Sequence, residues 1–141
     1  MTILRCSFDR YAISLCRCLT VSASVSSVKT GEVVYSGPLL PEADIKIESP
    51  FLWSIDDPQL YELTVKLKNG GREDSFTTRF GFRDAVFRED GFYLNGVKVK
   101  IRGLNRHQCW PYVGYAMPKS QQRLDAEILK KELGLNAVRT S

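Results

Sequence analysis

An alternating apolar segment runs into three consecutive polar side chains at Ile101-Arg102-Gly103-Leu104-Asn105-Arg106-His107. His107 is the single histidine of the chain. The residues before this run have strand-like patterns, and those after it predict a loop, a helix and a second strand. A strand that ends in polar residues and continues into a helix and a strand is typical of the first unit of an α/β barrel, where the chemistry lies at the carboxyl ends of the strands. The alternative is a strand whose polar end simply reaches the surface.

The helix is expected over Lys119–Leu133. Ser120 is its expected N-cap, and Glu127 and Lys131 have the i,i+4 spacing of an ion pair. Gly134 fits the left-handed position that commonly follows a helix end. These signals predict a helix with a defined start and a defined stop.

The six residues Asn136-Ala137-Val138-Arg139-Thr140-Ser141 predict the second strand. This strand has no room to finish before the chain stops. We therefore expect a chain that is cut from a longer one.

Short strands with one apolar face and tight turns dominate residues 28–101. Each strand has one face made by alternate residues. These sets are Ala43, Ile45 and Ile47; Tyr61, Leu63, Val65 and Leu67; Phe76, Thr78, Phe80 and Phe82; and Val97, Val99 and Ile101. The alternation of the last set continues up to Gly103. Asn69-Gly70-Gly71 and Asn95-Gly96 supply the positive-φ residues that tight hairpin turns require. Val33-Val34-Tyr35 predicts a short strand that ends at Ser36-Gly37-Pro38, and one or two strands are expected within Tyr11–Val25. Several short antiparallel strands at this spacing indicate a β-sandwich.

A loop is expected over Phe51–Tyr61, because Pro58 and two aspartates interrupt any regular element. Trp53 in this loop could stack against a sugar or plug the core under the loop. Its apolar neighbours Phe51 and Leu52 favour the core plug. We favour packing, because large aromatic side chains mostly serve that role.

The composition is that of an ordinary globular protein, with 141 residues, 43% hydrophobic and 26% charged. The net charge is +4, but basic and acidic residues are interleaved, so we expect no nucleic-acid partner. No apolar run is long enough to span a bilayer, and Asp9, Arg10 and Arg17 interrupt the segment where a signal peptide needs an apolar core. We expect no membrane partner.

The four cysteines are Cys6, Cys16, Cys18 and Cys109. Three of them crowd the amino terminus without a zinc-binding spacing, and the histidine is distant in sequence. This pattern favours free thiols in a reducing, cytoplasmic location and no metal site within the chain.

Six short motifs of the chain have a recognisable order. The two most distinctive are Arg102-Gly103-Leu104-Asn105-Arg106-His107 and Asn136-Ala137-Val138-Arg139-Thr140-Ser141. The others are Trp53-Ser54, Pro58-Gln59-Leu60-Tyr61, Phe80-Gly81-Phe82-Arg83 and Phe92-Tyr93-Leu94-Asn95-Gly96. Together they resemble the glycoside hydrolases of family 2, which include β-galactosidases, β-glucuronidases and β-mannosidases. The resemblance covers residues 28–141, in the family's order and roughly its spacing.

The family fold consists of a jelly-roll domain, an immunoglobulin-like sandwich and a (β/α)₈ barrel that holds the active site. The resemblance implies a mainly β chain with an immunoglobulin-like β-sandwich over residues 1–83. Residues 84–141 would form the first βαβ unit of a truncated TIM barrel. Residues 1–27 do not fit the strands that the family has there.

The resemblance implies a parent enzyme of carbohydrate metabolism that hydrolyses terminal β-D-galactosides with retention. Family members use two barrel glutamates, one as acid/base and one as nucleophile. Both motifs would lie beyond Ser141, so we expect no catalytic residue in this chain and no activity of the chain by itself. Asn105-Arg106-His107 looks more like β-galactosidases, since glucuronidases tend to have lysine at the middle position.

Three residues carry over from the family as substrate-binding residues. His107 matches a histidine that hydrogen-bonds a sugar hydroxyl, Arg139 matches an arginine near the nucleophile, and Asn105 belongs to the His107 motif. Arg106 is expected to be structural. The resemblance also implies magnesium or sodium near the active site of the full-length enzyme, but those ligands match no residue here. Because the two strands are adjacent and parallel in a barrel, His107 and Arg139 are expected at the same rim.

Two alternatives stay open at the level of the sequence. One is a stand-alone β-sandwich module that binds carbohydrate, with Trp53, Trp110 and Tyr112 as stacking groups, although half a βαβ unit argues against it. The other is a fragment of a β-glucuronidase or a β-mannosidase. The sequence also leaves the oligomeric state open, and a homo-oligomer is one option for the full-length parent.

Overall fold

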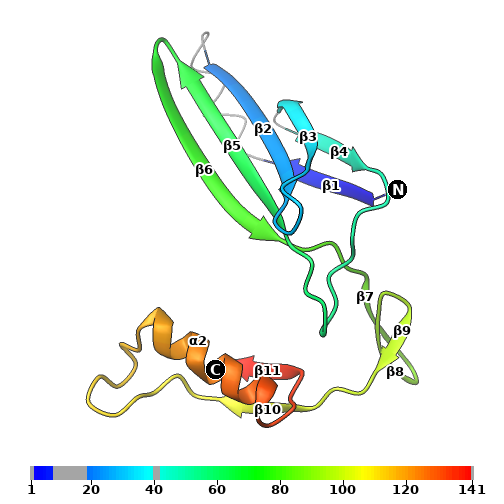
Figure 1. The fold of residues 1–141 in the computed structure, drawn as a ribbon, viewed down its shortest axis with the longest axis vertical. Helices are drawn as coiled ribbons and strands as arrows, with labels where there is room; N and C mark the ends of the chain where they lie inside the picture. Colours follow the sequence, from blue (N-terminus) through cyan, green and yellow to red (C-terminus); the bar gives the residue numbers. More distant parts are fainter. Residues whose placement is uncertain (1, 8–18, 40–41, 141) are drawn as a thin grey trace. The chain divides into compact units, whose positions relative to one another are not determined.

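The computed structural model describes residues 2–7, 19–39 and 42–140. Strands dominate these residues, and α2 (Lys119–Lys131) is the single helix among them. The chain divides into two compact units, Met1–Asp84 and Ala85–Ser141. In Figure 1 the described strands of the first unit run from blue to green, and the second unit runs from yellow-green to red. The fold is mainly β, as predicted.

Two antiparallel sheets make up the first unit. The larger sheet has the strand order β3-β2-β5-β6, and the smaller sheet pairs β1 with β4. The strands are β1 (Thr2–Ser7), β2 (Leu19–Ser27), β3 (Val33–Pro38), β4 (Glu42–Ile47), β5 (Tyr61–Asn69) and β6 (Arg72–Phe80). The two sheets form the predicted sandwich (Figure 1).

The core of the first unit draws on both sheets. Its buried residues are Ala23, Val25, Leu39, Ile45, Ile47, Tyr61 and Phe82. The Tyr61 ring meets the Phe82 ring edge-on, with 5.0 Å between centroids. The Tyr61 hydroxyl accepts the backbone N–H of Phe51 at 2.9 Å, which satisfies the polar tip of a buried ring. The alternating positions Ile45, Ile47 and Tyr61 therefore belong to this core, whereas Leu67 and Phe76 of the predicted apolar faces are 42% and 67% exposed.

The hairpin between β5 and β6 confirms the turn predicted at Asn69-Gly70-Gly71. Its first residue pairs with Arg72, and its glycines have φ angles of 52° and 90°. The predicted end of the third strand at Ser36-Gly37-Pro38 is wrong, because these residues pair with Ser22–Ser24 and belong to β3. Of the strands expected within Tyr11–Val25, β2 covers residues 19–25, and residues 11–18 lie outside the described residues.

The loop between β4 and β5 packs against the end of β6. A Cβ atom at Gly81 would lie 2.8 Å from the Cβ of Trp53, so the close approach requires glycine. The guanidinium of Arg83 lies 5.6 Å from the centroid of the Trp53 ring. Trp53 is half-buried, which agrees with a packing role. Its neighbours Phe51 and Leu52, whose apolar character favoured that role, are themselves 57% and 44% exposed.

A three-stranded antiparallel sheet opens the second unit. It consists of β7 (Ala85–Arg88), β8 (Gly91–Leu94) and β9 (Val97–Val99), in that order. The turn predicted at Asn95-Gly96 is confirmed, with φ angles of 51° and 79°. The sequence did not predict β7. The prediction of one strand from Val97 to Gly103 is wrong, because β9 ends at Val99 and a separate strand begins at Gly103.

The predicted strand, helix and strand follow as β10 (Gly103–Arg106), α2 and β11 (Ala137–Thr140). Pro118, with φ −68°, takes the N-cap position in place of Ser120, and no side chain caps the helix start. The predicted ion pair is present, with 3.4 Å between Lys131 Nζ and Glu127 Oε2. Gly134 has the expected left-handed backbone, with φ 63°. This unit is the βαβ layout expected from the sequence.

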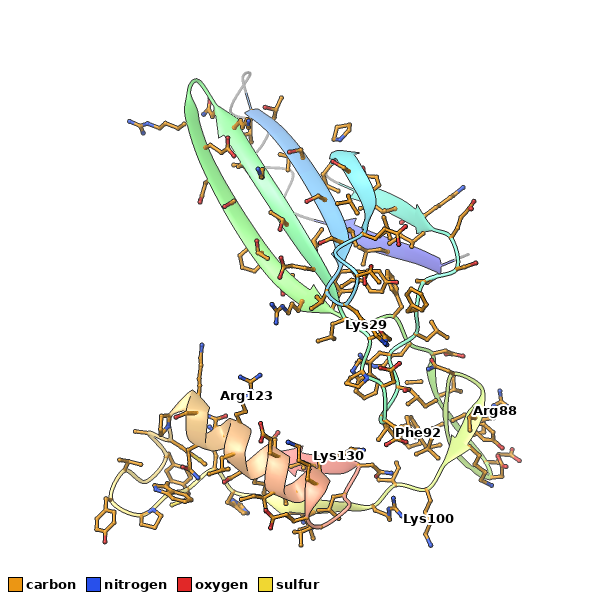
Figure 2. All side chains as sticks on the ribbon, viewed as in Figure 1. Lys29, Arg88, Phe92, Lys100, Arg123 and Lys130 are labelled. Atoms are coloured by element: carbon orange, nitrogen blue, oxygen red, sulfur yellow. The ribbon has the colours of Figure 1, made fainter. Side chains whose placement is uncertain are left out.

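No residue of α2 is buried. Figure 2 shows Arg123 and Lys130 projecting from the helix. No helix in the described ranges is long and apolar enough to cross a membrane. Cys109 is an exposed free thiol. The free thiols predicted at Cys6, Cys16 and Cys18 lie outside the side chains that the structure describes.

Candidate functional site

The strands β10 and β11 are parallel neighbours, so their carboxyl ends meet at one edge. Their register places Asn105 opposite Arg139 and Arg106 opposite Thr140. Successive residues of a strand point to opposite faces, and opposed residues of neighbouring strands share a face. Asn105 and Arg139 therefore lie on one face of this two-stranded sheet, and Arg106 and Thr140 lie on the other.

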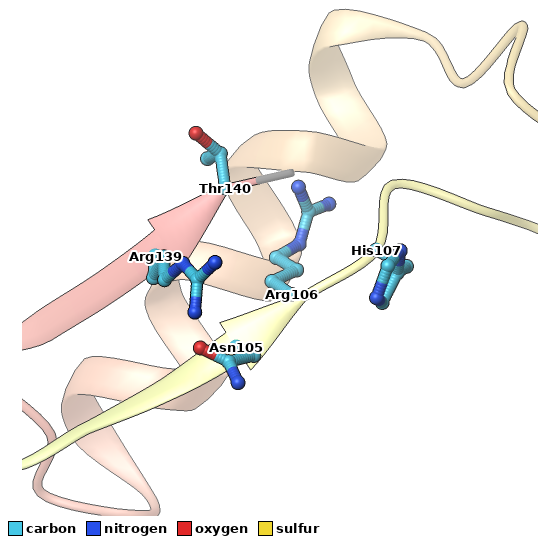
Figure 3. Close-up of a pocket in the computed structure, with 5 residues that line it drawn as sticks. All are labelled: Asn105, Arg106, His107, Arg139 and Thr140. Atoms are coloured by element: carbon cyan, nitrogen blue, oxygen red, sulfur yellow. The ribbon is translucent and has the colours of Figure 1, made fainter.

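The contacts of Arg106 identify the face that α2 covers. Its guanidinium donates to Asp125 Oδ2 of the helix, from Nε at 3.1 Å and from Nη2 at 2.7 Å. Asn105 and Arg139 therefore lie on the face away from the helix. His107 comes two residues after Asn105, at the position that continues the same alternation. Figure 3 shows the Arg106 guanidinium and the Thr140 side chain on one side of the strands, and Asn105 and Arg139 on the other.

A hollow of about 110 Å³ opens at these strand ends. Its lining residues are Asn105, Arg106, His107, Arg139 and Thr140. Apart from the half-buried Arg106, all of them are exposed. The structure thus brings together the three residues singled out from the sequence, His107, Arg139 and Asn105.

The lining side chains are suited to binding hydroxyls and carboxylates. A neutral imidazole donates one hydrogen bond and accepts another, and a primary amide does the same with more donors. A guanidinium offers several N–H donors in a fixed plane, which suits a carboxylate. None of the lining residues is an Asp or a Glu. The hollow can therefore bind and orient a ligand, and its lining offers no carboxylate as a nucleophile or a general acid.

Asn136 joins the two strands before their ladder begins. Its Oδ1 accepts the N–H of Arg102 at 2.7 Å, and its Nδ2 donates to the carbonyl of Lys100 at 2.9 Å. Its own N–H donates to the carbonyl of Arg102 at 2.9 Å. Side-chain amides commonly bond backbone groups in this way, and here the amide extends the ladder backwards. No sequence pattern pointed to this role of Asn136.

Gly103 allows β10 and β11 to approach each other closely. A Cβ atom at this position would lie 2.8 Å from the carbonyl oxygen of Ala137. Glycine within a strand often marks such a close backbone approach. Gly103 and Asn136 therefore set the strand spacing on which the positions of Asn105 and Arg139 depend.

We searched the described residues for clusters of metal-ligating side chains. Among the described residues, no three His, Cys, Asp or Glu side chains gather into a group that could hold a metal ion. The magnesium or sodium implied for the full-length enzyme stays a prediction.

Two family models match the chain. The model for the glycosyl hydrolases of family 2 matches residues 15–83, and the model for the TIM barrel domain of the same family matches residues 86–141. The chain belongs to glycosyl hydrolase family 2. Its first unit contains the immunoglobulin-like domain of the family, and β10, α2 and β11 are the start of the family's TIM barrel.

Named members of family 2 are similar to this chain over most of its length. The β-galactosidase of Thermoanaerobacterium thermosulfurigenes is 57% identical over 108 residues, which are 77% of this chain and 14% of that protein. The β-galactosidase of Thermoanaerobacter pseudethanolicus is 54% identical over 99 residues, 69% of this chain and 13% of that protein. A crystal structure of Parabacteroides merdae β-glucuronidase superimposes with a TM-score of 0.81 at 30% identity, covering 99% of this chain and 19% of that chain. The chain thus spans only about 14% of the length of the first of these relatives.

Proposed function

We propose that the protein carrying this chain is a retaining glycosidase that hydrolyses terminal β-D-galactosides. Membership in family 2 supports a carbohydrate substrate. The galactoside is supported by the two relatives that share 57% and 54% identity and are named β-galactosidases. The middle residue Arg106 of the Asn-Arg-His run also agrees with the β-galactosidase pattern noted in the sequence.

One observation carries the proposal for the site. Asn105 and Arg139 are directly opposed on the face of β10 and β11 that α2 leaves open, with His107 directly after β10. In an α/β barrel the face away from the helices points inward, and the carboxyl ends of the strands form the active-site rim. The three side chains are then in position to bind a sugar at the mouth of the barrel.

In the proposed reaction this chain and the rest of the barrel supply different groups. In a retaining mechanism one carboxylate attacks the anomeric carbon while a carboxylic acid protonates the leaving oxygen, and water later releases the sugar from the first carboxylate. The hollow contains neither group, so this chain supplies binding and orientation. His107 and Asn105 hold sugar hydroxyls, and Arg139 orients the attacking carboxylate of another barrel strand.

A second candidate is a β-glucuronidase. The crystal structure that covers 99% of this chain with a TM-score of 0.81 is a β-glucuronidase. A glucuronide differs from a galactoside in carrying a carboxylate, which a glucuronidase must bind with cationic groups. Substrate preference therefore separates the two candidates.

The test compares three aryl glycosides that share one leaving group, a β-D-galactoside, a β-D-glucuronide and a β-D-mannoside. The longer protein that contains this chain is purified from a host without its own β-galactosidase, and kcat/KM is measured for each. We expect the galactoside to be preferred by at least about a hundredfold, because a site built to pair sugar hydroxyls rejects analogues that leave its groups unpaired.

The stereochemistry provides the second readout. The first-formed sugar is expected to keep the β configuration, which an NMR time course of the anomeric proton records. A preference for the glucuronide would transfer the proposal to the second candidate. Inversion, or no turnover of any of the three glycosides, would contradict the proposal itself.

A further inference from the structure

Arg106 connects three segments of the second unit. It ends β10, its guanidinium donates to Asp125 of α2 at 2.7 and 3.1 Å, and its Nη2 lies 3.3 Å from the sulfur of Met117. Met117 is buried, and its carbonyl accepts the side-chain N–H of Gln122 at 3.2 Å. The strand end, the end of the following loop and the helix therefore converge on a single guanidinium.

This ion pair is less exposed to solvent than six other ion pairs of the described residues. The side chains of Arg106 and Asp125 are 16% and 26% exposed. In each of those six ion pairs at least one side chain is more than half exposed. Exposed pairs contribute little to stability, whereas removing one partner of a shielded pair leaves an uncompensated charge. Arg106 is thus held toward α2 more firmly than a surface arginine would be.

The orientation of Arg106 determines that of its neighbours. Side chains alternate along a strand, so a fixed Arg106 directs Asn105 and His107 to the opposite face. Arg106 is also the last residue of β10 that pairs with β11, opposite Thr140. His107 therefore lies just beyond the ladder, and the anchor next to it is the side chain of Arg106.

We propose that Asp125 is a positioning residue of the active site, which acts through Arg106 to hold Asn105 and His107 on the sugar-binding face. This inference rests on the proposed function and deepens it. Asp125 itself lies on the helix side of the strands and does not line the hollow. Its effect on catalysis is therefore indirect.

The test uses Asp125→Asn in the longer protein, which keeps the shape of the side chain and removes its charge. We expect kcat/KM on the aryl β-galactoside to fall at least about tenfold, mainly in kcat, because small misplacements of binding groups weaken transition-state contacts most. Asp125→Glu, which keeps the charge, is expected to recover part of the loss. Glu127→Gln is the matched control, since it removes an exposed helix ion pair two residues away, and its activity should stay within about twofold.

A double substitution separates action through Arg106 from independent action. If Asp125 works through Arg106, adding Asp125→Asn to Arg106→Gln lowers kcat/KM by no more than about twofold, because the interaction is already lost. If the loss of kcat/KM in the double variant equals the product of the losses in the two single variants, the inference is overturned. All assays are run at a temperature where circular dichroism shows every variant folded. A lowered melting temperature with unchanged kcat in Asp125→Asn would make the pair purely structural and would also overturn it.

Hydrogen exchange keeps this inference separate from the proposed function. Asp125→Asn is expected to speed exchange of the Asn105 and His107 amides, and Glu127→Gln is expected to leave them unchanged. If the unsubstituted protein does not cleave the galactoside, the proposed function fails, while the exchange result still decides whether Asp125 holds the strand end. Unchanged exchange at both amides would overturn the inference whatever the substrate is.

Discussion

His107 follows the last paired residue of β10 and is exposed at the hollow. Its backbone carbonyl accepts the N–H of Cys109 at 3.0 Å, so the loop contact at this position belongs to the backbone. The imidazole is therefore available for a ligand. Substituting alanine for His107 keeps the backbone contact of the loop and removes the imidazole alone.

We expect His107→Ala in the longer protein to lower kcat/KM on the aryl β-galactoside at least about tenfold, or roughly 1.4 kcal/mol. The physical reason is the loss of a hydrogen bond that strengthens in the transition state. Transition-state-like inhibitors should lose more affinity than substrate-like ones. Unchanged kinetics together with a lower melting temperature would make His107 a loop residue and refute its assignment to the site.

Gly103 provides a second test at the scale of single residues. Gly103→Ala is expected to destabilise the second unit by about 1–3 kcal/mol, because the new methyl group would lie 2.8 Å from the Ala137 carbonyl oxygen. Urea unfolding measures the change, with Lys100→Ala as the control because that side chain is exposed. Equal stability of the Gly103→Ala and Lys100→Ala proteins would show that the strands can separate without cost.

The positions of Asn105, His107 and Arg139 could be predicted from the sequence, whereas the roles of Gly103 and Asn136 could not. A parallel strand pair meets at its carboxyl ends whatever its details, so polar residues there can be placed from pattern alone. Gly103 matters because its backbone lies close to Ala137, and Asn136 matters because its side chain donates to the carbonyl of Lys100. Both contacts join residues more than 30 positions apart and leave no local signal.

Asp90, Tyr93 and Lys98 stabilise the sheet of β7, β8 and β9 through a shared carboxylate oxygen. The Tyr93 hydroxyl donates to Asp90 Oδ2 at 2.7 Å and Lys98 Nζ donates to it at 3.0 Å. The hydrogen bond from Tyr93, followed by that from Lys98, holds the pKa of Asp90 below its ordinary value of 3.8. A carboxyl whose folded-state pKa is lowered stabilises above its unfolded pKa and loses that contribution as the pH falls through the folded value.

We therefore expect Asp90→Asn to destabilise this sheet near neutral pH and to make no difference well below pH 3.8. Amide exchange in β8, measured in both proteins over a pH series and corrected for the intrinsic exchange rate, records the effect. Glu89→Gln, next to Asp90 on the exposed turn, is the control. A difference between wild type and Asp90→Asn that persists unchanged in acid would contradict the role of the carboxylate.

Element boundaries were the part of the fold that sequence patterns predicted least well. The alternation from Val97 to Ile101 suggested one strand, but Asn136 captures the backbone of Lys100 and Arg102 and separates β9 from β10. The helix begins at Lys119 as expected, but its N-cap is Pro118, which has an extended backbone, and not Ser120, which had the chemistry of an N-cap. Both errors come from tertiary or neighbouring-residue effects that override local propensity.

The two units differ in how well their apolar residues are covered. Val25, Ile47 and Tyr61 of the first unit are at most 2% exposed. In the second unit Leu104 and Val138 are 51% and 42% exposed. Local stability follows burial, so the units should open with different free energies.

We expect amides near Val25 and Leu63 in the first unit to exchange more slowly than those near Leu104 and Val138 in the second. Hydrogen exchange of the 141-residue chain measures this directly. In the longer protein, Leu104 and Val138 are expected to gain protection as further barrel strands and helices cover them, whereas Val25 should change little. Equal protection of the two units in the 141-residue chain would contradict the expectation.

We propose that Asn105, His107 and Arg139 form part of a galactoside-binding site at the carboxyl ends of β10 and β11. The decisive test of this claim is a crystal structure of the longer protein with a galactose-derived inhibitor. We predict that side-chain atoms of His107 and Asn105 lie within about 3.2 Å of sugar hydroxyls, with Arg139 beside the attacking carboxylate. A sugar bound in the barrel without contact to any of these three residues would contradict the claim.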